Sequence, residues 1–257
     1  MATQTNFDQL LTEASAVPTI GWDFSWFDGR ATEARPSWNY SRSLLRRIES
    51  SKAMLELQTG GGERLAEILS RVECRPGTMV ATESWRPNVE LAKVNLAPFD
   101  ISVLEIDDEA VFPYSGEAFD LVCARHPTTT RWEEIARVLQ HGGTFFSQQI
   151  GSGTNGELTD FMMGSQPISE SQSAHLAATL AGKAGLEVLD LREETLPVVF
   201  FDVGAVVYFL RKVVWTVPDF TIEKYRERLF EMYEHIQQYG SFQSHAKRFL
   251  IEARNPH

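Results

Sequence analysis

Residues 53–63 read Ala-Met-Leu-Glu-Leu-Gln-Thr-Gly-Gly-Gly-Glu, and this stretch decides the fold. Its apolar first half predicts a short buried strand, and the three successive glycines predict a sharp turn. Glycine suits such a turn because it accepts backbone angles that other residues avoid, and because the missing Cβ lets a ligand approach the main chain. Residues 63–71 then have the spacing of a helix. A strand, a glycine turn and a helix in this order are typical of nucleotide-binding α/β proteins.

The same alternation of short apolar runs and amphipathic segments continues toward the C-terminus. Further strands are expected at 78–82, 101–106, 119–124, 144–149, 186–191 and 246–253. Helices are expected at 89–95, 131–139 and 171–184. This alternation predicts an α/β fold with a parallel sheet and helices on both of its faces. We expect residues 53–257 to form that domain.

Two segments fall outside the alternating pattern. Residues 1–52 are rich in aromatic side chains and predict a helical extension, and a segment at about 197–243 is longer than an ordinary connection between strands. Both are predicted to form a lid over a substrate, although aromatic clusters are also common in protein cores. The aromatic and acidic side chains that we assign to this lid are Trp22, Trp26, Trp38, Tyr40, Phe201 and Asp202, with Phe200 and Tyr208 beside them.

Composition narrows the class of partner. The 257 residues include 24 Lys and Arg against 35 Asp and Glu, a formal net charge of -11, which disfavours a nucleic-acid partner. No apolar run is long enough to span a bilayer, and the N-terminus lacks the pattern of a signal peptide, so we expect a cytoplasmic protein that does not bind membranes. The two cysteines, Cys74 and Cys123, have no neighbouring ligands, so no metal is expected. A monomer or a homodimer is equally compatible with the sequence.

Acidic residues follow the predicted strands at the places where a nucleoside would need them. Glu83 ends the second predicted strand, roughly 20 residues beyond the glycine turn, where a carboxylate can accept both ribose hydroxyls. Asp107 and Asp108 follow the third predicted strand. The alternative for each is a solvated carboxylate in a surface turn. Because the carboxyl ends of parallel strands meet at one edge of a sheet, we expect these side chains to face the glycine turn.

These motifs together resemble the class I, Rossmann-like S-adenosylmethionine-dependent methyltransferases, in particular bacterial enzymes that act on small molecules. The resemblance spans about residues 53–150 and includes a Phe-Asp-x-Val strand at Phe119 and a Gly-Gly turn after His141. It implies a seven-stranded, mostly parallel sheet of order 3-2-1-4-5-7-6, with an antiparallel last strand. Gln58 departs from the family pattern, since it stands where the first glycine is usual.

The resemblance also implies a cofactor and the residues that hold it. The cofactor is S-adenosyl-L-methionine, and the product is S-adenosyl-L-homocysteine. Counting back from Phe119 favours Asp108 over Asp107 as the residue that binds the adenine amino group. The residues implied at the cofactor are Glu56, Gln58, Thr59, Gly60, Gly62, Glu83, Ser84, Asp107, Asp108, Glu109 and Arg125.

Candidate catalytic residues follow the fourth predicted strand. His126 titrates near neutral pH and is the candidate general base, and Arg125 could orient an anionic group of the substrate. The alternative for His126 is a purely structural role at the end of the strand. Gln148 and Gln149 end the fifth strand, and because side chains alternate along a strand, only one of them should face the same cleft.

We therefore expect methyl transfer to an oxygen or nitrogen of a small-molecule acceptor, which could be a specialised metabolite. One alternative is a methyltransferase that acts on RNA or on a protein. The negative net charge of the chain counts against RNA. Another is a protein that binds S-adenosylmethionine without catalysis, which Gln58 in the glycine turn favours.

Overall fold

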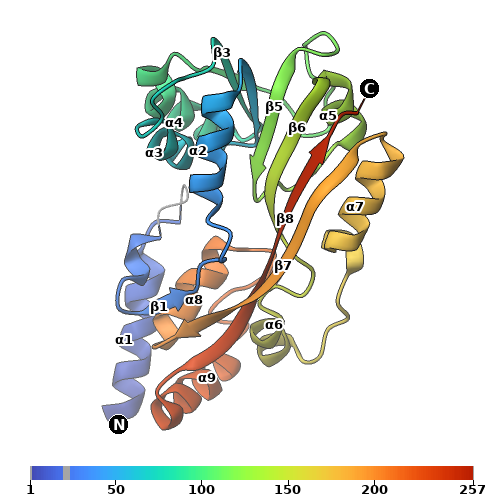
Figure 1. The fold of residues 1–257 in the computed structure, drawn as a ribbon. Helices are drawn as coiled ribbons and strands as arrows, with labels where there is room; N and C mark the ends of the chain where they lie inside the picture. Colours follow the sequence, from blue (N-terminus) through green and yellow to red (C-terminus); the bar gives the residue numbers. More distant parts are fainter. Residues whose placement is uncertain (1, 20–23, 257) are drawn as a thin grey trace. The chain divides into compact units, whose positions relative to one another are not determined.

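The computed structural model describes residues 2–19 and 24–256, so that the predicted lid residue Trp22 lies outside the described residues (Figure 1). The chain divides into two compact units. Unit 1 comprises residues 1–35, 152–169 and 195–247, and unit 2 comprises residues 36–151, 170–194 and 248–257. The predicted division at residue 52 does not coincide with these limits, because the helix at 40–50 belongs to unit 2.

Strands and helices alternate through unit 2 as the sequence predicts. The strands of the chain are β1 (Ala31–Glu33), β2 (Ala53–Leu57), β3 (Thr78–Glu83), β4 (Ser102–Glu105), β5 (Phe119–Arg125), β6 (Leu139–Ile150), β7 (Glu187–Phe200) and β8 (Phe242–Arg254). The α-helices are α1 (Ala2–Ala16), α2 (Tyr40–Ser50), α3 (Glu63–Leu69), α4 (Arg86–Leu96), α5 (Trp132–Val138), α6 (Gly156–Met163), α7 (Ala174–Lys183), α8 (Val203–Lys212) and α9 (Arg226–Tyr239).

The sheet has the order β1-β7-β8-β6-β5-β2-β3-β4. Strands β4, β3, β2, β5 and β6 are parallel, and β8 is antiparallel to β6. The seven predicted strands therefore follow the predicted order. The prediction of seven strands is wrong by one, because β1 pairs antiparallel with the end of β7. Only three residues long, β1 is too short to show a period of two in the sequence.

Each face of the sheet in unit 2 has its own hydrophobic core. Along β5, Leu121 and Cys123 pack into one core with α2, α3 and α4, while Val122 and Ala124 pack into the other with α5 and α7. Side chains alternate between the faces of a strand, so a strand buried on both faces reads as a continuous apolar run. This burial holds the carboxyl ends of β2, β3 and β5 in register, and these ends carry the candidate site.

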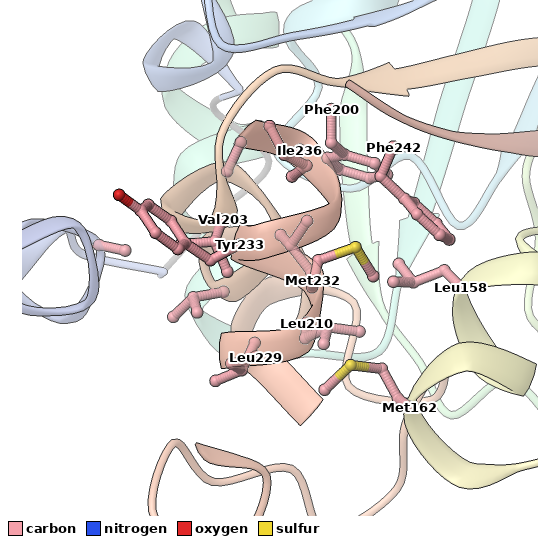
Figure 2. Packing of buried hydrophobic residues seen from close by; sticks show 14 of the residues in the cluster. Leu158, Met162, Phe200, Val203, Leu210, Leu229, Met232, Tyr233, Ile236 and Phe242 are labelled. Atoms are coloured by element: carbon pink, nitrogen blue, oxygen red, sulfur yellow. The ribbon is translucent and has the colours of Figure 1, made fainter. Parts of the chain in front are cut away.

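Unit 1 has a separate core formed by α1, α6, α8 and α9 with the end of β7 and the start of β8. Figure 2 shows Met162 of α6 and Met232 of α9 close to Leu210 of α8, with Phe242 at the start of β8 beside them. The insertion predicted at about 197–243 contributes most of these residues, and it contains both α8 and α9. In the described part of the chain, no helix is both long and apolar enough to cross a membrane.

Candidate functional site

The turn after β2 requires glycine for two different reasons. Gly60 and Gly62 both have positive φ angles, 65° and 79°, which favour glycine. Gly62 is also the residue directly before α3. A Cβ added to Gly62 would lie 2.9 Å from the Leu96 side chain and 3.2 Å from the Ala92 backbone of α4. Gly60 therefore shapes the turn, and Gly62 lets α3 pack closely on α4.

Glu83 at the end of β3 points to this turn. Its carboxylate accepts hydrogen bonds from the backbone N–H of Gly60 at 2.8 Å and of Trp85 at 3.0 Å. Burial raises the pKa of Glu83 above its usual value, backbone hydrogen bonds including that from Ser84 oppose the shift, and the nearby charge of Asp108 adds to it. Glu83 therefore contacts the glycine turn directly, and Asp108 lies within electrostatic reach of Glu83.

Glu56 is buried beneath the same turn. Its side chain is 4% exposed and accepts a hydrogen bond from the Thr59 hydroxyl at 2.6 Å. Burial raises the pKa of Glu56 to about 7, against the opposing effects of the Thr59 hydrogen bond and the Arg125 charge. Arg125, the last residue of β5, therefore lies within electrostatic reach of the glycine turn from the neighbouring strand.

Gln58 connects the glycine turn to the loop after β5. Its amide oxygen accepts hydrogen bonds from the backbone N–H of Thr128 at 2.6 Å and from the Thr128 hydroxyl at 3.0 Å, and its amide nitrogen donates to the Thr129 carbonyl at 2.7 Å. Thr128 and Thr129 were not among the predicted site residues, although they belong to a polar run at 128–130 that follows closely on the end of a strand. This Gln58 bridge borders a cavity of only about 10 Å³, lined also by Asp107, Asp108 and Arg131.

The three acidic residues after β4 take part in different hydrogen bonds. Asp108 accepts a hydrogen bond from the Thr128 hydroxyl at 2.9 Å, so it belongs to the Gln58 bridge. Asp107 accepts one from the Glu109 backbone N–H at 2.8 Å, which closes the local turn. Glu109 itself is exposed, and its backbone carbonyl accepts a hydrogen bond from Arg131. Of the three, Asp107 and Asp108 line the cavity beside Gln58.

His126, Gln148 and Trp38 form a hydrogen-bonded chain at the ends of β5 and β6. Trp38 Nε1 donates to Gln148 Oε1 at 2.8 Å, and the Gln148 amide nitrogen lies 2.9 Å from His126 Nε2. Burial, with the charge of Arg125, lowers the pKa of His126 well below its usual value, so the ring is neutral and Nε2 accepts from the amide. His126 also has a φ of 56°, in the left-handed region.

The remaining predicted lid residues differ in their burial and in their contacts. In unit 2, Tyr40 is buried, stacks on Phe146 and donates a hydrogen bond to the Ala124 carbonyl at 3.0 Å. Gln149 follows Gln148 along β6 and lies on the opposite face of the sheet.

In unit 1, Trp26 packs against Tyr208 and Arg30. Asp202 caps α8 by accepting a hydrogen bond from Ala205 N–H, Phe200 is buried, and Phe201 is exposed.

No protein-family model and no curated protein sequence matches this chain. Solved structures do match. The YcgJ protein from Bacillus subtilis is 15% identical with a TM-score of 0.60, covering 86% of this chain and 99% of that one. A methyltransferase candidate from Bacillus halodurans is 17% identical with a TM-score of 0.57, covering 84% and 98%. The [4+2]-cyclase SpnF is 15% identical with a TM-score of 0.52, covering 99% and 96%.

The chain has the class I methyltransferase fold. The sheet order and the antiparallel last strand agree with this assignment, which confirms the fold expected from the sequence. At these levels of identity the similarity extends to the fold and not to the activity, because one fold can host many reactions. Activity must be argued from the residues at the carboxyl edge of the sheet.

Proposed function

We propose that this protein is an S-adenosylmethionine-dependent methyltransferase that acts on an oxygen or nitrogen of a small molecule. The observation that carries the proposal is the hydrogen bond between the Glu83 carboxylate and the backbone N–H of Gly60, because it joins a strand-end carboxylate to the glycine turn in a chain of this fold. The net charge of -11 supports a small-molecule acceptor over RNA.

The residues around the glycine turn fit this cofactor in their chemistry. Glu83 would accept the ribose hydroxyls, Asp108 would accept the adenine amino group, and the turn at Gly60 lets the backbone approach the ligand. The cavity beside Asp108 and Gln58 measures only about 10 Å³, so the Gln58 bridge would open when the nucleoside enters. Glu56, Thr59 and Arg125 lie beneath the turn and would fix its shape and charge.

The catalytic part of the proposal rests on the end of β5. S-adenosylmethionine supplies an electrophilic methyl group when it is bound, so the protein must place a nucleophile in line with that group and remove its proton. Arg125 would orient an anionic part of the acceptor. His126 is neutral, as a general base must be, but its Nε2 accepts a hydrogen bond from Gln148. For His126 to take the proton at Nε2, the Gln148 amide would first release that nitrogen.

A methyl-transfer assay tests the proposal. Purified protein is incubated with tritiated S-adenosylmethionine and a panel of small hydroxyl and amine acceptors. We expect at least one acceptor to be labelled, and we expect His126→Ala to lose turnover while it keeps its affinity for S-adenosylhomocysteine. His175→Ala, at an exposed position of α7, is the matched control and should retain turnover. Unchanged turnover in His126→Ala would remove His126 from the reaction.

A second candidate is a protein that binds the nucleoside without transferring a methyl group. The Gln58 bridge favours it, since this side chain closes the turn where the family pattern has glycine. The [4+2]-cyclase SpnF is an example of a similar structure with another named activity. Binding of S-adenosylhomocysteine without labelling of any acceptor would support this candidate over the first.

A further inference from the structure

The outer edge of β7 is open over the first half of the strand. β7 lies between β8 and β1 in the sheet, and Figure 1 shows β8 (red) alongside it. β1 pairs only with residues 198–200, at the far end of β7. Before that point, the backbone N–H of Ser37 donates a hydrogen bond to the Glu194 carboxylate at 3.0 Å. Among the described residues, no strand pairs with the outer edge of residues 187–193, which belong to unit 2.

The open edge presents backbone donors and acceptors in a regular pattern. At the far end of β7, the Ala34 N–H donates to the Pro197 carbonyl at 3.0 Å, and the Phe201 N–H donates to the Arg30 carbonyl at 2.8 Å. Odd-numbered residues of β7 therefore direct their N–H and C=O groups to the outer edge. Every odd-numbered residue from 187 to 197 is also exposed, so the alternation of side chains is unbroken and no bulge interrupts the strand. The odd-numbered residues of the open part are thus placed to pair with a further strand.

Two exposed leucines lie on this open part. Leu189 and Leu191 are 47% and 38% exposed, and they lie on the same face of the strand. Native proteins often protect a sheet edge with Lys, Pro or a bulge, and residues 187–196 contain no Lys and no Pro. The edge therefore combines unpaired backbone groups with apolar side chains, which favours pairing with another chain.

Charge selects how a second copy would pair. Two antiparallel β7 strands related by a twofold axis in the middle of the open edge can have that axis at residue 190, 191 or 192. With the axis at Leu191, Asp190 lies opposite the partner's Arg192, and the two Leu191 side chains are neighbours. With the axis at Asp190 or Arg192, that residue lies opposite its own copy, so like charges meet. Since opposite charges stabilise a strand pair and like charges destabilise it, the Leu191 axis is favoured among the three.

We infer that this protein forms a twofold homodimer through the outer edges of β7, with Asp190 of each chain opposite the partner's Arg192. Asp190 and Arg192 form an ion pair within one chain at 2.6 Å, so both side chains already lie on one face of the strand. In the dimer the same two residues also contact their counterparts, which makes a cluster of alternating charge. The inference does not depend on methyl transfer.

Sedimentation velocity of the whole chain over a dilution series tests the inference. We expect the wild type to sediment as a dimer at high concentration and to dissociate on dilution. Leu191→Lys places two ammonium groups opposite each other and should be monomeric throughout. Val94→Lys, at an exposed apolar position of α4, is the matched control and should dimerise as the wild type does. A wild type that is monomeric at every concentration would leave the edge to another partner, such as an extended peptide, and would overturn the inference. Dimers of Leu191→Lys would also overturn it.

Two charge variants test the register of the strands. Asp190→Arg and Arg192→Asp each place like charges opposite one another, so each variant alone should be monomeric. Mixed in equal amounts, they should form a heterodimer, because the arginines of one chain then face the aspartates of the other. Misfolded variants could not regain dimers on mixing, so this rescue separates a lost interface from a lost fold. A mixture that stays monomeric while circular dichroism shows both variants folded would contradict the inference.

Discussion

Gln58 and Glu56 flank the glycine turn in states that side chains of their type seldom adopt. Gln58 has a φ of 53°, in the region that favours glycine, and keeps it while its side chain makes three hydrogen bonds to the loop after β5. Glu56 is buried with its pKa raised to about 7. Unusual backbone and protonation states concentrate at functional sites, which agrees with a ligand site at this turn.

Replacing Gln58 tests whether its bridge closes the nucleoside space. Gln58→Gly removes three hydrogen bonds, each worth about 1 kcal/mol net, and relieves the positive φ. We expect S-adenosylhomocysteine to bind about tenfold more tightly, as measured by isothermal titration calorimetry. Thr128→Val removes only the hydroxyl contacts and should show a smaller gain. A loss of affinity in Gln58→Gly would mean that the side chain contacts the ligand rather than blocks it.

Glu56 predicts a specific dependence of stability on pH. Its folded pKa of about 7 lies above the usual value of 4.5 for a glutamate, so the folded chain holds this proton more tightly than the unfolded chain. The contribution of Glu56 to stability is therefore full below pH 4.5 and is lost as the pH rises through 7. Relative to the wild type, Glu56→Gln should gain about 3 kcal/mol in its free energy of unfolding between pH 4.5 and 8. Urea titrations of both proteins at several pH values measure the free energies of unfolding. A difference between variant and wild type that stays constant with pH would refute the prediction.

At the scale of elements, the packing of α3 on α4 positions the turn. The two helices meet at Gly62, where an added Cβ would collide with Leu96. Gly142, on β6, has a similar φ of 77° but nothing within 4 Å of a built Cβ. These two glycines separate the cost of the backbone angle from the cost of the collision.

We expect Gly142→Ala to lose about 1 kcal/mol of stability from the positive φ alone. Gly62→Ala should lose about 2–4 kcal/mol, since overpacking adds to the same strain, and it should also weaken nucleoside binding. Chemical denaturation and calorimetry of both variants measure the two quantities. Similar losses in the free energy of unfolding of the two variants would show that the contact between α3 and α4 accommodates the added Cβ without a loss of stability.

The sequence predicts elements whose pattern is local and misses those that depend on distant partners. Strands β2, β3 and β5 are buried on both faces, so their continuous apolar runs identify them, and the spacing from the turn identifies Glu83. Strand β1 was missed because its three residues form a strand only by pairing with the end of β7. The partners of Gln58 were missed because Thr128 is 70 residues away in sequence.

At the scale of the whole molecule, charge decides between classes of acceptor. A net charge of -11 repels a polyanion on average, and binding to RNA depends on phosphate contacts by Lys and Arg. We expect no measurable binding of a short single-stranded RNA at physiological salt in a fluorescence anisotropy titration. Binding that weakens steeply with added salt would instead support an RNA methyltransferase.

The central claim is that the glycine turn and the Glu83 carboxylate together hold a nucleoside. Isothermal titration of S-adenosylhomocysteine into the wild type, Glu83→Gln and Glu105→Gln tests it most directly, because Glu105 is exposed and lies beside Glu83 on the neighbouring strand β4. We expect the wild type and Glu105→Gln to bind equally well, and Glu83→Gln to bind at least tenfold more weakly without unfolding. No binding to the wild type, or equal binding to all three, would contradict the account.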